Sequence, residues 1–149
     1  MQASQTRTQL QMRAGAAMAT LGGFLSLAQY RTIGQAFRGE EGDWFMHKAI
    51  ELADQVRAMP MTYQQDGLGD DAVVHLHYFL RGADWYITER DVDLDRAGQR
   101  QAFGLADLFG DGGELGYISI VDMIAAGAEL DLHWTPRTLG EVKRERAHA

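Results

Sequence analysis

Cysteine is absent from this chain of 149 residues, and proline occurs only twice. Without cysteine the chain forms no disulfide bond, no cysteine–zinc site and no thiol nucleophile. Because disulfides are characteristic of oxidising compartments, the cytoplasm is the default location that we expect for a cysteine-free chain.

Long hydrophobic runs are also missing. No run approaches the ~18–20 apolar residues that a helix needs to cross a bilayer. Residues 1–23 lack the uninterrupted apolar core and the cleavage site of a secretion signal. Hydrophobic residues make up 46% of the chain and charged residues 23%, a composition typical of a single globular domain over residues 1–149.

Positive charge is scarce in the C-terminal part of the chain. Residues 1–60 hold six Lys or Arg and five Asp or Glu, whereas residues 61–149 hold eight and sixteen, a net charge of −8. A field of this sign repels nucleic-acid backbones, so direct nucleic-acid binding is not expected. It favours solubility or a basic partner.

Apolar residues recur at helical spacing in residues 1–60, which predicts a helical segment. A first helix is expected up to Thr20, where a pair of glycines interrupts it. Ser26 and Gln29 have the spacing of a capping box and open a second helix, with a single kinked helix as the alternative. Gly39 is expected to end that helix in a left-handed conformation.

A third helix has the clearest pattern. Asp43 is its expected N-cap, and Pro60 ends it. Its apolar stripe consists of Phe45, Ala49, Leu52, Ala53 and Val56. Residues 61–71 are then expected to form a loop.

Residues 72–134 alternate short hydrophobic strands with polar turns, the pattern of an antiparallel β-meander. The expected strands cover residues 73–80, 85–90, 101–108, 114–119 and 128–134. Capping patterns predict a short helix after Ser119, before the last strand, and a C-terminal helix after Thr138. Helices followed by a meander indicate an α+β fold, with N-terminal helices packed on an antiparallel sheet of about five strands.

Several motifs of this region occur in the order and spacing of a known family. They are VV at 73–74, WYITE at 85–89, AFGLADL at 102–108, ELGYISI at 114–120 and LDLHWTPRTL at 130–139. On these motifs, residues 70–149 resemble the bacterial family called domain of unknown function 2958, and the N-terminal helices resemble it more loosely. The chain departs from the family in a longer helical segment before the sheet and in a polar insertion near residues 91–100.

The resemblance implies the setting of a plasmid or another mobile genetic element. It transfers no catalytic residue, because the family has no established activity. The matching residues are expected to determine the fold. Trp85 and Tyr86 would pack on opposite faces of the sheet, and Gly104 and Gly116 would allow close backbone approach or bulges.

Histidines in the strands are the candidate metal ligands. His75 and His77 are two residues apart, which places both rings on one face of a strand. If the last strand lies beside the first, His133 and Asp131 reach the same face. Three imidazoles and one carboxylate would suit zinc or another divalent ion with a position open for water. The alternative is a structural role for His75 and His77 beneath a helix.

Carboxylates form a second candidate cluster of Asp84, Glu89, Asp107 and Glu114. Glu89 and Asp107 fall in neighbouring strands, as a pair for acid–base catalysis requires. The alternative places Asp84 in a turn and Glu89 at a strand end. The glycines of residues 109–116 match no phosphate-binding motif and predict a turn.

These features support three functional hypotheses. The first is a non-enzymatic accessory protein of a bacterial mobile element that acts through protein–protein contacts. In its narrower form this protein counters host defence by presenting carboxylates in place of DNA phosphates. The second is a small metal-dependent enzyme built on His75, His77 and His133. The third is a domain that binds a small ligand between the third helix and the sheet.

Overall fold

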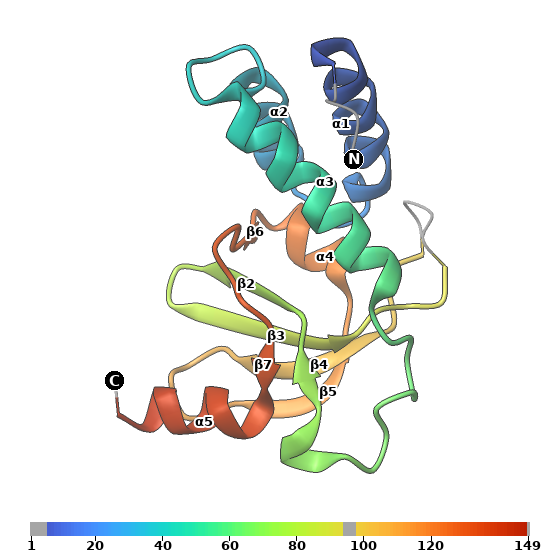
Figure 1. The fold of residues 1–149 in the computed structure, drawn as a ribbon. Coiled ribbons are helices and arrows are strands. Elements are labelled where there is room, and N and C mark those ends of the chain that lie inside the picture. The colour runs from blue at the N-terminus through green and yellow to red at the C-terminus, as the bar shows by residue number, and fades with distance from the viewer. Residues whose placement is uncertain (1–5, 94–97, 149) are drawn as a thin grey trace.

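The computed structural model describes residues 6–93 and 98–148 and shows the predicted α+β fold. Three helices come first, α1 (Arg7–Leu21), α2 (Leu27–Ala36) and α3 (Gly42–Ala58). They lie together at one end of the molecule, above the sheet (Figure 1). Within the described ranges, none of the helices has the length and apolar character needed to cross a membrane.

The main sheet is antiparallel and has the strand order β5-β4-β3-β2-β6. Its strands are β2 (Leu76–Leu80), β3 (Ala83–Glu89), β4 (Ala102–Asp107), β5 (Glu114–Ile118) and β6 (Glu129–Leu130). Helix α4 (Ile120–Ala125) precedes β6, and α5 (Leu139–Ala147) follows it. Because β6 returns beside β2, β5 lies at the opposite edge of the sheet.

The strand predicted over residues 73–80 is divided in two. Strand β1 (Val73–Val74) pairs with β7 (Arg137–Thr138) in a separate two-stranded sheet, and β2 begins at Leu76. The prediction of one strand was wrong because its two halves pair with different neighbours. The last strand of the meander is also shorter than predicted, with two residues in place of 128–134.

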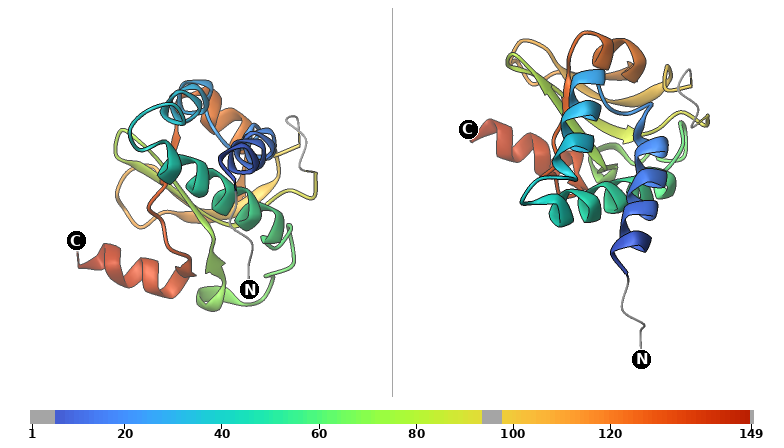
Figure 2. Two further views of the ribbon diagram at one scale, coloured as in Figure 1. Left: turned by 45° about the horizontal axis from the view of Figure 1, so that its top comes forward. Right: turned by 90° about the horizontal axis from the view of Figure 1, so that it is seen from above.

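Each face of the main sheet has its own core, which agrees with the prediction that Trp85 and Tyr86 pack on opposite faces. Trp85 packs with the helices on the face that we call the helix face, and Tyr86 lies on the other, which we call the α5 face. The core of the α5 face consists of Ala72, Val74, Tyr86, Leu105, Leu139 and Val142. Figure 1 and the left view of Figure 2 show α5 apart from the N-terminal helices, as two separate cores require.

Most helix ends follow the predicted caps. Three predicted N-cap side chains accept a backbone amide of the first turn: Ser26, Ser119 and Thr138. Asp43 is not an N-cap, because α3 starts one residue before it and its carboxylate forms an ion pair with Arg7 of α1. Gly39 was predicted to be left-handed but is not among the residues with positive φ.

Gly104 lies where the backbone of β3 leaves no room for a side chain. A Cβ atom there would lie 2.0 Å from the carbonyl oxygen of Tyr86. The irregularity of the β3–β4 pairing begins at Ile87, the residue opposite Gly104. The close approach predicted for Gly104 is therefore confirmed. A Cβ atom at Gly116 would have no neighbouring atom within 4 Å, so the same prediction was wrong there.

We expect Gly104→Ala to lower the free energy of unfolding by about 3 kcal/mol, because the new methyl group forces β3 and β4 apart. Gly116→Ala is the matched control and should change it by less than about 1 kcal/mol. Urea denaturation of both variants measures the difference. Equal stability of the two variants would contradict the packing described for β4.

Candidate functional site

His77 on β2 has both ring nitrogens hydrogen-bonded to carboxylates. Nδ1 lies 3.0 Å from Asp131 Oδ2, and Nε2 lies 2.7 Å from Asp84 Oδ1. The imidazole also stacks on the ring of Tyr86, with centroids 4.8 Å apart. Asp131 is brought to His77 by the pairing of β6 with β2, which was the condition for its place on this face. Asp84 lies within β3 and not in a turn.

The four predicted metal ligands do not converge. His77 and Asp131 are in contact, but His75 lies at the break between β1 and β2, where burial lowers the pKa of its ring. His133 lies beyond the short β6, and its ring packs against Trp44 of α3 with centroids 5.7 Å apart. Within residues 6–93 and 98–148, no group of three such side chains is placed to hold a metal ion.

A buried carboxylate, Asp107, anchors α5 to the sheet. It has no exposed surface, pairs with the Arg146 guanidinium and accepts the Gly110 amide at 2.8 Å. Burial raises the pKa of the Asp107 carboxyl, but the hydrogen bonds from Arg146 and Gly110 outweigh it and bring the pKa below its ordinary value. Arg146 also pairs with Asp84 at 3.3 Å, which links this anchor to His77.

The predicted pair of Glu89 and Asp107 is not formed. Asp107 lies opposite Asp84, and Glu89 lies opposite Phe103 near the other end of the strand pair. The prediction was wrong because antiparallel strands place the end of β3 against the start of β4. Glu114 lies on β5, opposite Ala106 of β4, and does not join either carboxylate.

Glu89 holds the loop of residues 61–69 over the sheet. Its carboxylate is buried and accepts the backbone amides of Tyr63 at 2.8 Å and Gln65 at 2.7 Å. Tyr63 has a φ of 79°, a left-handed conformation that costs a non-glycine residue about 1–2 kcal/mol. The loop is thus fixed with Tyr63 in a strained conformation, and the ring of Tyr63 lies beside β5.

Four side chains form a cluster where the α5 face reaches β5, three of them exposed and Phe103 half-buried. We call Tyr63, Phe103, Leu115 and Tyr117 the aromatic patch. The ring of Tyr117 is edge-on to Phe103 and to Tyr63, with centroids 5.9 Å and 6.4 Å away. Leu115 is 47% exposed, Tyr117 58% and Tyr63 66%. The hydroxyl groups of Tyr63 and Tyr117 share a hydrogen bond, which raises the pKa of Tyr117.

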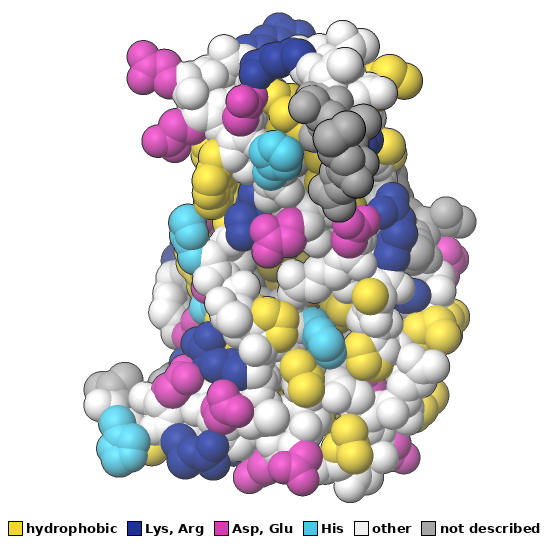
Figure 3. Space-filling view, in the orientation of Figure 1, with side chains coloured by type: hydrophobic (Ala, Val, Ile, Leu, Met, Phe, Trp, Pro, Cys, Tyr) yellow, Lys and Arg dark blue, Asp and Glu magenta, His cyan; other side chains and the backbone are white. Residues whose placement is uncertain are grey.

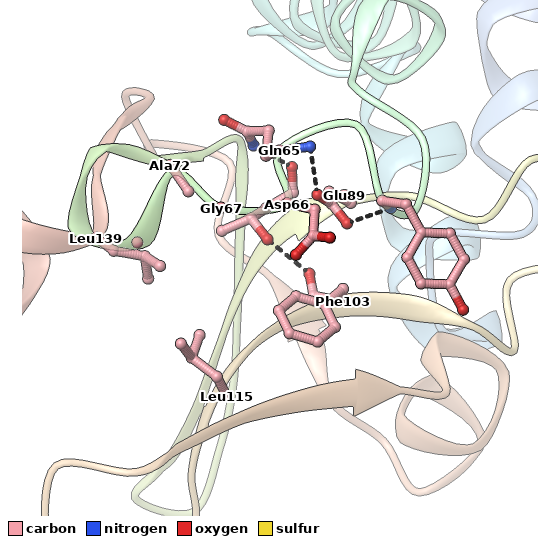
Figure 4. Close-up of a pocket in the computed structure, with 11 residues that line it drawn as sticks. Gln65, Asp66, Gly67, Ala72, Glu89, Phe103, Leu115 and Leu139 are labelled. Atoms are coloured by element: carbon pink, nitrogen blue, oxygen red, sulfur yellow. Dashed lines mark hydrogen bonds between the residues drawn. The ribbon is translucent and has the colours of Figure 1, made fainter.

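A hollow of about 440 Å³ lies beside the aromatic patch, between the loop of residues 61–69 and the sheet. In Figure 4, Phe103 and Leu115 rise from the strands below the loop, and Leu139 closes one side. Asp66 and Glu89 contribute the charged groups of its lining. This hollow, which we call the loop hollow, lies on the α5 face and not between α3 and the sheet, where a ligand site was predicted.

Sequence patterns did not single out Tyr63, Leu115 or Tyr117. The signal that was present is the strand of residues 114–118, which carries Leu115 and Tyr117 on one face and Ile118 on the other. An edge strand with apolar residues on both faces exposes one set unless another element covers it. Tyr63 lies in a polar loop, and no local pattern marks it.

We expect Asp107→Asn to lower the free energy of unfolding by about 2–3 kcal/mol at neutral pH, because Arg146 loses its fully buried charged partner and keeps the longer ion pair with Asp84. The folded-state pKa of Asp107 is lowered, so its stabilising contribution is complete above the unfolded pKa of about 4. That contribution is lost as the pH falls through the folded-state pKa. Urea unfolding should therefore show a smaller difference in stability between the parent and Asp107→Asn at about pH 3 than at about pH 7. The control is Asp111→Asn, which changes an exposed turn residue. A loss of stability in Asp107→Asn that is equal at both pH values would contradict the ion pair.

The geometry of His77 predicts that protein purified without a histidine tag binds no stoichiometric zinc. Both ring nitrogens already have carboxylate partners, so coordination would require breaking one of these hydrogen bonds. Elemental analysis of the parent and of His75→Ala/His77→Ala should give the same low zinc content. One zinc ion per molecule in the parent, absent from the variant, would contradict this prediction and support a metal site at these histidines.

The chain matches no family model, no curated protein and no solved structure. Its resemblance to the family called domain of unknown function 2958 rests on the motifs of residues 70–149 and stays a prediction. Function is therefore inferred from the side chains of this chain alone.

Proposed function

We propose that this chain is a non-enzymatic protein that binds a partner protein through the aromatic patch. The observation that carries the proposal is a row of side chains across the α5 face, formed by His77, Tyr86, Leu105 and Leu115. Tyr86 and Leu105 are buried in the core beneath α5, whereas Leu115, at the edge, is exposed beside three aromatic rings. Exposed apolar patches with polar surroundings are typical of interaction sites.

The strained loop gives further support. The ring of Tyr63 is mostly exposed, so it adds little to the core, yet the chain retains its left-handed φ. Strain of this kind persists where the surrounding structure enforces it, and it is concentrated at functional sites. The buried carboxylate of Glu89 holds Tyr63 in this conformation by accepting hydrogen bonds from the Tyr63 and Gln65 amides.

The ionisable groups of the α5 face favour binding over catalysis. His77 is held between Asp84 and Asp131, and Asp107 is engaged by Arg146. A general acid or base needs an atom free to face a substrate. The Asp107–Arg146 pair instead joins α5 to the sheet, and the contacts of His77 join β2 to β3 and to the residue after β6, which supports a structural role for them.

The narrower form of the proposal is a partner that presents a basic surface, such as a host-defence protein that binds DNA. Residues 61–80 and 101–122 form the loop and the strands around the patch and contain no Lys or Arg. Asp66, Asp111 and Glu114 are exposed carboxylates in these segments. On the family resemblance, we further propose that this protein is an accessory protein of a bacterial mobile element.

A small cationic ligand in the loop hollow is the second candidate. A volume of about 440 Å³ is within the range of small-molecule sites, and Asp66 in its lining would select positive charge. Native mass spectrometry of protein purified from its own host cells tests it. A reproducible added mass that is lost in Asp66→Leu would favour this candidate.

Tyr63→Gly/Tyr117→Ser tests the proposed function without unfolding the protein. Glycine removes the left-handed strain, so we expect stability to change by no more than about 1 kcal/mol. The parent and this variant are each used to capture proteins from a lysate of the host, and the captured proteins are quantified by mass spectrometry. We expect at least one protein to be captured by the parent and to be at least tenfold less abundant with the variant.

The control is Met12→Gln/Leu27→Gln, which changes two exposed apolar residues on the N-terminal helices. It should retain the same protein as the parent does. If the aromatic variant captures the same proteins in the same amounts as the parent, the patch is not the binding surface.

A further inference from the structure

Strand β5 is an unprotected edge of the main sheet. Among the residues that the structure describes, it pairs with β4 alone, over five consecutive residue pairs from Ala102–Ile118 to Ala106–Glu114 without a register shift. The outer edge of such a strand presents backbone amides and carbonyls at alternate residues. Natural edge strands are usually blunted by proline, lysine, a bulge or very short length. The sequence of β5, ELGYI, has no proline, lysine or bulge, and its one charged residue is Glu114 at the first position, whereas the opposite edge strand β6 has two residues.

Hollows lie beside β5 in the positions that side chains of an added strand would reach. The loop hollow lies on the α5 face next to Leu115. A second hollow of about 340 Å³ lies at the β4–β5 hairpin. Its lining includes Glu114, Gly116 and Ile118, whose side of β5 is the helix face, and it also reaches Leu115 and Tyr117 of the other face. Successive side chains of a strand point to opposite faces, so a strand beside β5 would direct them alternately to these two hollows.

The charge around β5 distinguishes between possible occupants. The linings of both hollows contain carboxylates, Asp66 and Glu89 in one and Asp111 and Glu114 in the other, and neither contains Lys or Arg. A second copy of this chain would bring the same carboxylates together across the edge. A segment with Lys or Arg would instead be attracted to them. In Figure 3, apolar side chains also gather over the lower half of the molecule, below the N-terminal helices.

We infer that β5 binds an extended segment of the partner as a sixth strand of the sheet, with alternating apolar residues flanked by Lys or Arg. This inference rests on the proposed function and specifies the chemistry of the partner. Backbone hydrogen bonds to the free edge supply affinity, and the two hollows and the aromatic patch select the side chains. The carboxylates around β5 select the basic flanks.

Three fluorescent probe peptides test the inference by anisotropy titration. They are KVTFTVK, the acidic counterpart EVTFTVE, and KVTFTVK with every interior amide nitrogen methylated. We expect the basic peptide to bind saturably and at least tenfold more tightly than the acidic one. The methylated peptide should not bind, because it lacks the donors that pair with β5.

Charge reversal on the protein provides the matched test. Glu114→Lys, on β5, should weaken binding of KVTFTVK at least threefold and strengthen binding of EVTFTVE. Glu129→Lys, an exposed position on the opposite edge strand, is the control and should change neither. On binding of the basic peptide, amide hydrogen exchange should slow at alternate residues of β5 and stay unchanged in β3.

Several results would overturn the inference. They are absence of binding by all three peptides, equal binding of the basic and acidic peptides, and binding of the methylated peptide. A concentration-dependent dimer that Tyr117→Lys abolishes would identify a second copy as the occupant instead. If a partner still depends on Tyr63 and Tyr117 while no peptide binds, strand addition fails and the proposed function stands.

Discussion

A guanidinium near the C-terminal end of α5 pairs with a carboxylate that has no exposed surface. This pair, Arg146 with Asp107, fastens α5 across β3 and β4, and Asp84 extends the contact to His77 on β2. Removing one partner of a buried ion pair leaves an uncompensated charge, so the attachment resists displacement. The helix has nine residues, and its buried side chains pack on Tyr86 and Leu105. The same face at β5 is therefore left exposed.

A second buried carboxylate has the corresponding role near the other end of the β3–β4 pair. Glu89 binds two amides of the loop of residues 61–69 and fixes Tyr63 beside Tyr117. The two anchors thus determine where the α5 face is covered, by α5 at one end and by the loop at the other. The loop hollow lies between this loop and the sheet, and the aromatic patch lies beside it at β5. The exposed surface is fixed by buried polar contacts and not by the exposed residues themselves.

Much of the fold could be predicted because it depends on interactions between residues close in sequence. The caps at Ser26, Ser119 and Thr138 satisfy amides three residues away, and the alternation around Trp85 and Tyr86 assigns each ring to one face. The candidate sites depended on pairings between distant segments and were less predictable. The pairing of β6 with β2 brings Asp131 to His77, but β6 ends too early to carry His133 to the same face.

The sequence by itself determined the α+β class, the order of helices and strands, the acidic charge of the C-terminal part and the apolar character of both faces of β5. Tertiary structure alone decided that β5 lies at an edge, that α5 covers its face of the sheet only in part, and that Tyr63 joins Tyr117. The reason is physical. Periodicity and capping record which way a side chain points within its own element, whereas exposure depends on which distant element packs over it.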